Sequence, residues 1–128
     1  MPIRRGSARV LFNEGAFAED TMRSGRAGAK VLREARGRFE RDGVEIKTLR
    51  RCDPEHRDGT KLPACFKVYL PPPNGKFGMV LRFIRDDEGL ALRCLAFGIR
   101  HHPRDSNAPT VYGIAHRRLH GQSSQESG

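Results

Sequence analysis

The sequence predicts an α+β domain. We expect an antiparallel β-sheet of about four strands, three of them in a meander, with N-terminal helices on one face and a short C-terminal helix. Two observations predict this fold. Residues 64–100 hold three strand-like runs separated by turn-forming residues. Upstream, residues 27–42 carry apolar side chains at helical spacing. This order places the helices on one face and leaves the other face of the sheet free.

The predicted meander consists of residues 66–70, 79–85 and 90–97. Three consecutive prolines and Asn74-Gly75 separate the first strand from the second, and Asp86-Asp87-Glu88-Gly89 joins the second to the third. In the first strand, apolar residues alternate with Lys67 and Tyr69. These two side chains are therefore expected on the free face of the sheet, where arginines of the later strands would complete a basic surface.

The elements before the meander are predicted from caps and periodicity. Residues 8–12 form a first strand, and Asn13 is placed to cap a helix over residues 14–22. The second helix spans residues 27–42, and Gly43 is placed to end it. Residues 44–49 are expected to be a short strand or an extended lead-in, and the polar residues 50–63 a loop.

After the meander, residues 101–109 are expected to form a loop and residues 110–120 a short helix. The apolar stripe of this helix is Val111, Ile114, Ala115 and Leu119. Residues 122–128 are rich in Ser, Gln and Gly, so we expect a single domain over 1–121 followed by a disordered tail.

The charge of the chain indicates a polyanionic partner. Its 128 residues include 24 Lys and Arg against 15 Asp and Glu, a formal net charge of +9. Because a guanidinium binds phosphate in a bidentate manner and stacks on bases, nucleic acid or an acidic protein is the first partner to test. A basic protein with no nucleic-acid role stays open on charge alone.

Composition also bounds the compartment and the chemistry. The three cysteines have no C-x-x-C spacing and are expected to be reduced thiols in a cytoplasmic protein, because we find no signal peptide and no apolar run long enough to span a membrane. His101 and His102 together with Cys94 lack metal-ligand spacing, so neither a metal site nor a cofactor is expected.

Several motifs, in this order, resemble the RelE/ParE superfamily of small bacterial toxins, which belong to type II toxin–antitoxin systems. Residues 10–17 (VLFNEGAF) resemble the family's first strand and helix, and residues 66–70 (FKVYL) its "YKIKL" strand. Residues 79–89 are similar to its "YRVLY…DDG" hairpin, and residues 95–100 (LAFGIR) to the end of its last strand. The terminal helix resembles "VYSEAVKRIL" at Val111-Tyr112, Ala115 and Arg118-Leu119.

This resemblance implies a RelE-like fold and a toxin that inhibits translation by cutting mRNA on the ribosome without a metal. In such a reaction the ribose 2′-OH attacks the adjacent phosphate, which gives a cyclic phosphate. The reaction needs a base, cations facing the phosphate oxygens and an acid for the leaving oxygen. The implied partners are an antitoxin protein, the ribosome and mRNA.

The resemblance and the expected free face together give the candidate residues. The candidate catalytic residues are Lys67, Arg82, Arg100, His101, His102 and Tyr112. The candidate nucleic-acid contacts are Lys67, Lys76, Arg85, Arg93, Arg100 and Arg117. A solvated lysine and a tyrosine that pins a helix are the plain alternatives for Lys67 and Tyr112. For Arg118 we expect a cation that complements the dipole of the terminal helix.

Two departures from the family pattern put nuclease activity in question. Met79 and Pro71 stand where nuclease members carry arginine. Two alternatives therefore stay open: a non-catalytic ParE-like toxin that binds DNA gyrase (or a degenerate toxin homologue), and a basic nucleic-acid-binding module of phage or plasmid origin.

Overall fold

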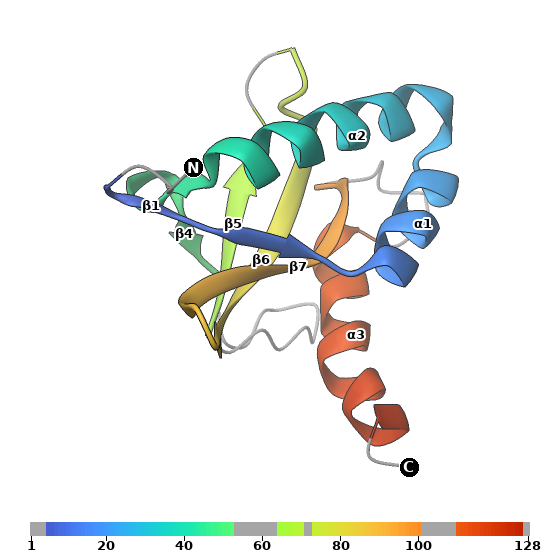
Figure 1. The fold of residues 1–128 in the computed structure, drawn as a ribbon. Coiled ribbons are helices and arrows are strands. Elements are labelled where there is room, and N and C mark those ends of the chain that lie inside the picture. The colour runs from blue at the N-terminus through green and yellow to red at the C-terminus, as the bar shows by residue number, and fades with distance from the viewer. Residues whose placement is uncertain (1–4, 53–63, 71–72, 101–109, 127–128) are drawn as a thin grey trace.

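A mixed β-sheet lies between two helical layers. The computed structural model describes residues 5–52, 64–70, 73–100 and 110–126 (Figure 1). In chain order the elements are β1 (Ser7–Ala8), β2 (Val10–Phe12), α1 (Glu14–Arg23), α2 (Gly25–Asp42), β3 (Val44–Glu45), a 3-10 turn (Ile46–Thr48), β4 (Arg50–Arg51), β5 (Cys65–Tyr69), β6 (Phe77–Asp86), β7 (Gly89–Ile99) and α3 (Val111–Glu126). The expected helices and the three-strand meander are therefore present, whereas α3 extends past the domain boundary expected at residue 121.

The main sheet has five strands in the order β2-β7-β6-β5-β4. Strand β2 runs parallel to β7, and the other neighbours are antiparallel, so the expected antiparallel sheet of about four strands is only partly confirmed. The three apolar residues of β2 do not encode which strand they join, because pairing is decided by the whole chain path. Separately, β1 pairs with β3 in a two-stranded ribbon, which splits the single strand expected over residues 8–12.

Local chemistry explains the two N-terminal helices. The Asn13 side chain accepts a hydrogen bond of 2.9 Å from the backbone N–H of Ala16, which is the N-cap expected for α1. Gly43 ends α2 with a φ of 73°, a conformation that side chains disfavour. Helix α2 places Leu32, Ala35 and Phe39 against the sheet, where they join the larger hydrophobic cluster.

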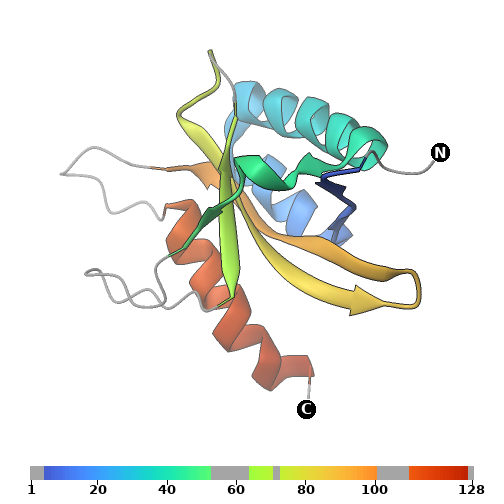
Figure 2. The same cartoon turned by 90° about the vertical axis from the view of Figure 1, so that its left-hand side faces the viewer.

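Helix α3 partly covers the opposite face of the sheet, whereas the sequence predicted that this face would be free. Helix α3 packs on β7 and β6, and Figure 2 shows α2 and α3 on opposite sides of the sheet. Val111, Ile114 and Ala115 form a second hydrophobic cluster with sheet residues that include Val80 and Ala96. The expected apolar stripe of the terminal helix is correct, but the stripe closes a second layer on the sheet.

A buried ion pair holds α3 in place. Arg118 is 7% exposed and Asp20, on α1, is 3% exposed. The guanidinium of Arg118 donates hydrogen bonds of 3.0 and 2.9 Å to the two oxygens of Asp20, and one of 2.8 Å to the carbonyl of Leu95. Leu95 is the extra residue of a β-bulge opposite Val80 and Leu81. The expected role of Arg118 as a cation that complements the dipole of the terminal helix is therefore wrong: it joins α1, β7 and α3.

Replacing Asp20 by asparagine should strongly destabilise the fold. The isosteric Asp20→Asn change leaves the Arg118 guanidinium buried without its counter-charge, which should lower the free energy of unfolding by about 3–5 kcal/mol. The matched control is Glu19→Gln. Glu19 also contacts Arg118, at 3.3 Å, but its side chain is 71% exposed, so its loss should cost less than about 1 kcal/mol. Urea unfolding of both variants tests this, and equal stabilities would contradict the role given to Asp20.

Candidate functional site

Strand β5 divides its side chains between the two layers. Val68 belongs to the hydrophobic cluster under α1 and α2, whereas Cys65 belongs to the cluster under α3. Because successive side chains of a strand point to opposite faces, Lys67 and Tyr69 lie on the α3 face. The expectation that these two residues share a face is correct, although the face is partly occupied by α3.

Residues from three other segments gather around Lys67 and Tyr69. Arg50 of β4 is the cross-strand neighbour of Lys67, and its Cζ atom lies 5.8 Å from the centroid of the Tyr69 ring. The Cζ atom of Arg100, which follows β7, lies 3.5 Å from the same centroid. The Nζ atom of Lys67 lies 5.6 Å from the centroid of the Tyr112 ring, in the first turn of α3. We call these five residues the cation–tyrosine cluster.

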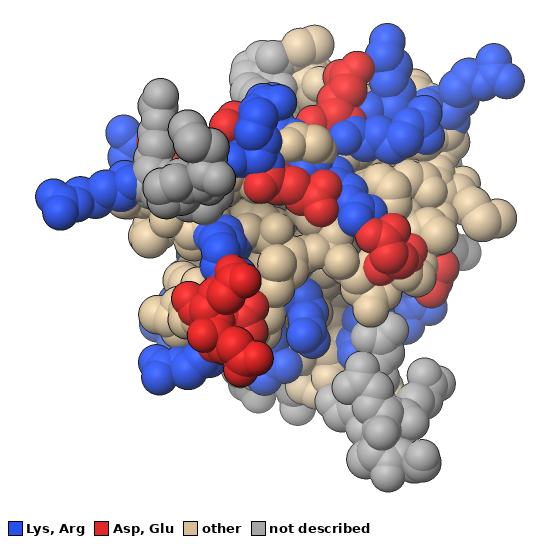
Figure 3. Space-filling view, in the orientation of Figure 1, with Lys and Arg blue, Asp and Glu red and all other residues tan. Residues whose placement is uncertain are grey.

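The cations of this cluster differ from arginines elsewhere on the protein, which lie among carboxylates (Figure 3). Arg9 pairs with Asp86 at 2.7 Å and Glu88 at 3.1 Å, and Arg36 pairs with Glu14 and Glu40. By contrast, Arg50, Lys67 and Arg100 form no salt bridge with any carboxylate of the described residues. Within the part of the chain that the structure describes, positive charge without a paired carboxylate therefore collects at the cation–tyrosine cluster.

Burial of Tyr112 favours the protonated form of its hydroxyl. Burial raises the pKa of Tyr112 above its ordinary value of 10.0, whereas a hydrogen bond from Arg100 and the charges of Lys67 and Arg100 act in the opposite direction. The phenol is therefore neutral at physiological pH. It can donate a hydrogen bond or stack on a ring, but it is poorly suited to take up a proton as a phenolate.

A second cationic pair lies farther along the same face. Arg82 of β6 is the cross-strand neighbour of both Cys65 and Arg93, so the two arginines face each other directly across β6 and β7. Both are exposed. Like charges directly opposite one another are unfavourable, and an anion bound between them would relieve that repulsion. No contact joins this pair to the cation–tyrosine cluster within the described residues.

Other sequence-predicted residues lie elsewhere. By alternation, Arg85 lies on the side of Phe83, which packs on the helical core, so it does not share the α3 face. The Nζ atom of Lys76 lies 5.3 Å from the ring centroid of Phe77, another residue of that core. Arg117 is exposed on α3. His101 and His102 lie outside the described residues.

Met79 does not occupy a site position. It is 1% exposed and belongs to the core under α1 and α2, on the face opposite Lys67. An arginine at this position would be buried among apolar side chains, so methionine here removes no cation from the α3 face. Pro71, the other departure from the family pattern, lies outside the described residues.

Sequence reasoning did not identify Arg50, Tyr69 and Gly78 as site residues. Tyr69 carried a usable signal, because it stands two positions after Lys67 in a strand. Arg50 carried none, since β4 has only two residues and follows a 3-10 turn. Gly78 is the cross-strand neighbour of Tyr69, and its place beneath Arg100 depends on strand register.

Among the described residues, no three His, Cys, Asp or Glu side chains come together as a candidate metal site. Within the same ranges, the helices are too short or too polar to traverse a lipid bilayer.

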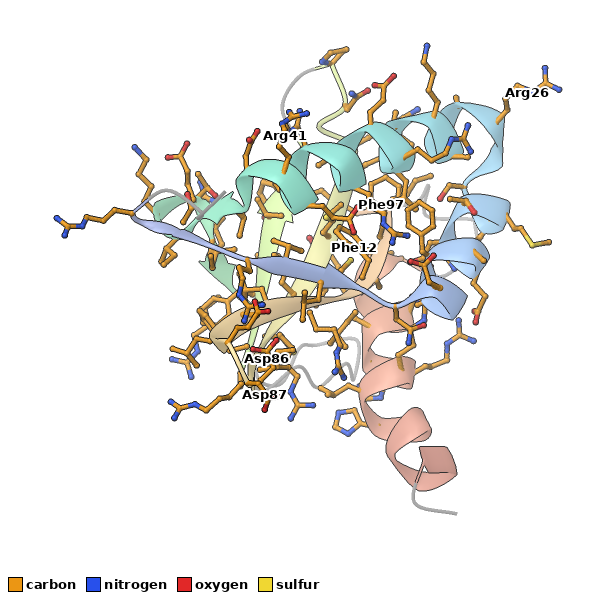
Figure 4. The ribbon with its side chains drawn as sticks, in the orientation of Figure 1. Phe12, Arg26, Arg41, Asp86, Asp87 and Phe97 are labelled. Atoms are coloured by element: carbon orange, nitrogen blue, oxygen red, sulfur yellow. The ribbon has the colours of Figure 1, made fainter. Side chains whose placement is uncertain are left out.

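The cations on α2 do not contribute to the site: Arg26 and Arg41 project from this helix away from the sheet (Figure 4).

Comparison with known proteins gives one distant structural likeness. No protein-family model matches the sequence, and no curated protein is significantly similar. A solved structure with a related chain path is that of a doubly substituted variant of the E. coli toxin RelE in the free state. It shares 19% sequence identity, and the match covers 88% of this chain and 98% of the other, with a TM-score of 0.43. A likeness of this size establishes neither a family nor a function.

Alkaline titration should report directly on the cation–tyrosine cluster. The chain has two tyrosines and no tryptophan, and both tyrosines lie in the cluster. In a Tyr69→Phe variant, the remaining phenol should ionise above pH 10.0, because burial disfavours the phenolate of Tyr112. Since the folded state then holds the proton more tightly than the unfolded state, stability should be full below pH 10 and fall as pH rises through the Tyr112 pKa. Absorbance at alkaline pH measures the midpoint, and a midpoint at or below 10 would contradict the burial of this ring.

Proposed function

We propose that this chain is the toxin of a type II toxin–antitoxin pair and acts as a metal-independent endoribonuclease that cleaves mRNA with the ribosome, in the cytoplasm. The observation that carries the proposal is the cation–tyrosine cluster, in which three exposed or half-buried cations and two aromatic rings share one face. Cations bind the phosphates of RNA, and tyrosine rings stack on unpaired bases. The motif resemblance of the sequence supports the same assignment.

The cluster fits phosphodiester cleavage by the ribose 2′-OH. As the 2′-oxygen attacks phosphorus, negative charge grows on the non-bridging oxygens, and positioned cations stabilise that charge. Lys67 and Arg50 lie side by side across β4 and β5 and have no carboxylate partner among the described residues. We assign the scissile phosphate to these two side chains.

Tyr112 would orient a base beside this phosphate. Its ring is half-buried against the sheet, and its neutral hydroxyl can donate a hydrogen bond. Proton transfer is assigned to histidine, whose pKa lies near neutrality. The candidates are His101 and His102, together with His116, which lies one helical turn beyond Tyr112 on α3.

A non-catalytic, polyanion-binding role is the second candidate. The Arg82–Arg93 pair favours it, because that pair offers an anion site without the aromatic rings that would orient a base. An acidic antitoxin segment or a nucleic acid would suit both cationic sites. A gyrase-binding toxin and a basic nucleic-acid-binding module are the two forms of this alternative.

Induced expression should arrest growth and leave messages cleaved. Lys67→Ala should reduce cleavage by about 10²–10³-fold, as expected for loss of one group that stabilises developing charge. Tyr112→Phe should reduce cleavage less, because the ring remains. The matched control is Lys30→Ala, on the exposed side of α2, which should leave cleavage unchanged. Mapping 5′ ends of messages after induction measures the effect.

Other outcomes identify the alternatives. Growth arrest with a DNA-damage response and intact messages would support the gyrase-binding form. Normal growth, with RNA binding that weakens as salt rises, would support the nucleic-acid-binding module. Either result would overturn the nuclease proposal.

A further inference from the structure

Arg100 is anchored to the protein more firmly than a ligand-binding cation usually is. Its backbone N–H donates a hydrogen bond of 2.9 Å to the carbonyl of Lys76, and its Nη1 atom donates one of 2.9 Å to the carbonyl of Gly75. Both acceptors lie in the turn before β6. Arg100 is thus held by its backbone and by its guanidinium to one turn.

The path of the Arg100 side chain depends on the glycine at position 78, which has no Cβ atom. Arg100 crosses Gly78, and a Cβ built on this glycine would lie 3.1 Å from the Cγ atom of Arg100 and 3.3 Å from the carbonyl oxygen of Val68. The Arg100 side chain would therefore have to move back by a few tenths of an ångström. Gly78 therefore allows the guanidinium to lie flat, 3.5 Å from the ring centroid of Tyr69.

The guanidinium of Arg100 is directed toward the protein rather than toward solvent. Arg100 also acts on the phenol of Tyr112, because its hydrogen bonding and its charge lower the pKa of that group. Its Nε atom is buried and has no hydrogen-bond partner among the described residues. A buried guanidinium N–H that is shielded by the Tyr69 ring is poorly placed to reach a phosphate outside.

The other two cations of the cluster face outward. Arg50 is exposed, and its Cζ atom is 5.8 Å from the Tyr69 centroid. Lys67 is half-buried and meets Tyr112 only through a ring contact of 5.6 Å. No hydrogen bond to another described residue fixes either side-chain cation, so both can exchange water for a phosphate oxygen at little cost.

We infer that Arg100 is a positioning residue, which aligns Tyr69 and Tyr112 from beneath, and that Gly78 is the residue that permits it, while Lys67 and Arg50 contact the phosphate. This inference rests on the proposed function in taking RNA as the ligand. It replaces the direct phosphate contact that the sequence predicted for Arg100. The alignment of the tyrosines is a property of the protein without RNA and can be tested separately.

The first experiment measures the Tyr112 phenol in the Tyr69→Phe background, without RNA. Arg100→Gln removes the hydrogen bond that stabilises the phenolate, so the titration midpoint should move upward. Gly78→Ala should move the midpoint in the same direction, because it displaces the same guanidinium. Arg26→Gln, on the exposed side of α2, is the matched control and should not change it. An unchanged midpoint in both Arg100→Gln and Gly78→Ala would overturn the inference, whether or not the protein binds RNA.

The second experiment separates positioning from phosphate contact by salt dependence. The probe is a 2′-O-methyl oligouridylate, which lacks the attacking hydroxyl and cannot be cleaved by this route. For a single strand, each phosphate contact contributes about 0.7 to the slope of log affinity against log salt. Lys67→Gln and Arg50→Gln should each lower the slope by about this amount. Arg100→Gln should weaken binding by about tenfold, the loss of one ordering contact, with the slope unchanged.

Conservative replacement completes the test. If Arg100 were a simple cationic contact, Arg100→Lys would keep both the affinity and the slope. For a positioning residue, lysine cannot reproduce the flat stack on Tyr69, so affinity should fall as in Arg100→Gln while the slope is kept. A slope lowered in Arg100→Gln and restored in Arg100→Lys would assign Arg100 to the phosphate and overturn the inference. If none of these proteins binds the probe, the nucleic-acid role fails, and the phenol titration alone decides the role of Arg100.

Discussion

The carboxylate of Asp20 is the contact on which the rest of the structure depends. It accepts hydrogen bonds from both terminal nitrogens of Arg118, one of 2.6 Å from Arg23 and one of 3.1 Å from the backbone N–H of Phe97. A buried ion pair contributes little net stability compared with an apolar pair of the same volume, but it tolerates only one geometry. Its role here is to specify where α3 lies on β7.

The position of α3 in turn decides what the α3 face can do. Tyr112 stands in the first turn of this helix, six residues before Arg118, and so the same helix carries both the anchor and the aromatic ring of the site. If α3 were displaced, Lys67 and Arg50 would keep their places on the sheet and lose the ring beside them. The chemistry of the site is therefore divided: the sheet supplies charge, and the helix supplies the orientation of a ligand.

Local sequence signals predicted much of this fold, whereas the pairing of segments that lie far apart in the sequence could not be predicted. The Asn13 cap, the glycine at the end of α2 and the turn at Asp86-Asp87 each act within a few residues, so the sequence indicates them directly. The parallel pairing of β2, the second layer formed by α3 and the burial of Arg118 depend on contacts between distant segments. The site follows the same division: alternation placed Lys67 correctly, but only strand register brought Arg50 and Gly78 to it.

Because β4 is short, the two parts of the cation–tyrosine cluster, Arg50 on β4 and Lys67 on β5, are expected to differ in local stability. Arg50 is carried by a two-residue edge strand with only two register partners on β5, whereas Lys67 belongs to a strand paired on both sides. Edge segments with so few hydrogen bonds open at a small fraction of the global unfolding free energy. The Lys67 half of the cluster is therefore expected to be the more persistent, and the Arg50 half to open more readily. A ligand that engages both halves must supply the entropy of ordering this edge, so part of its binding energy is spent on folding.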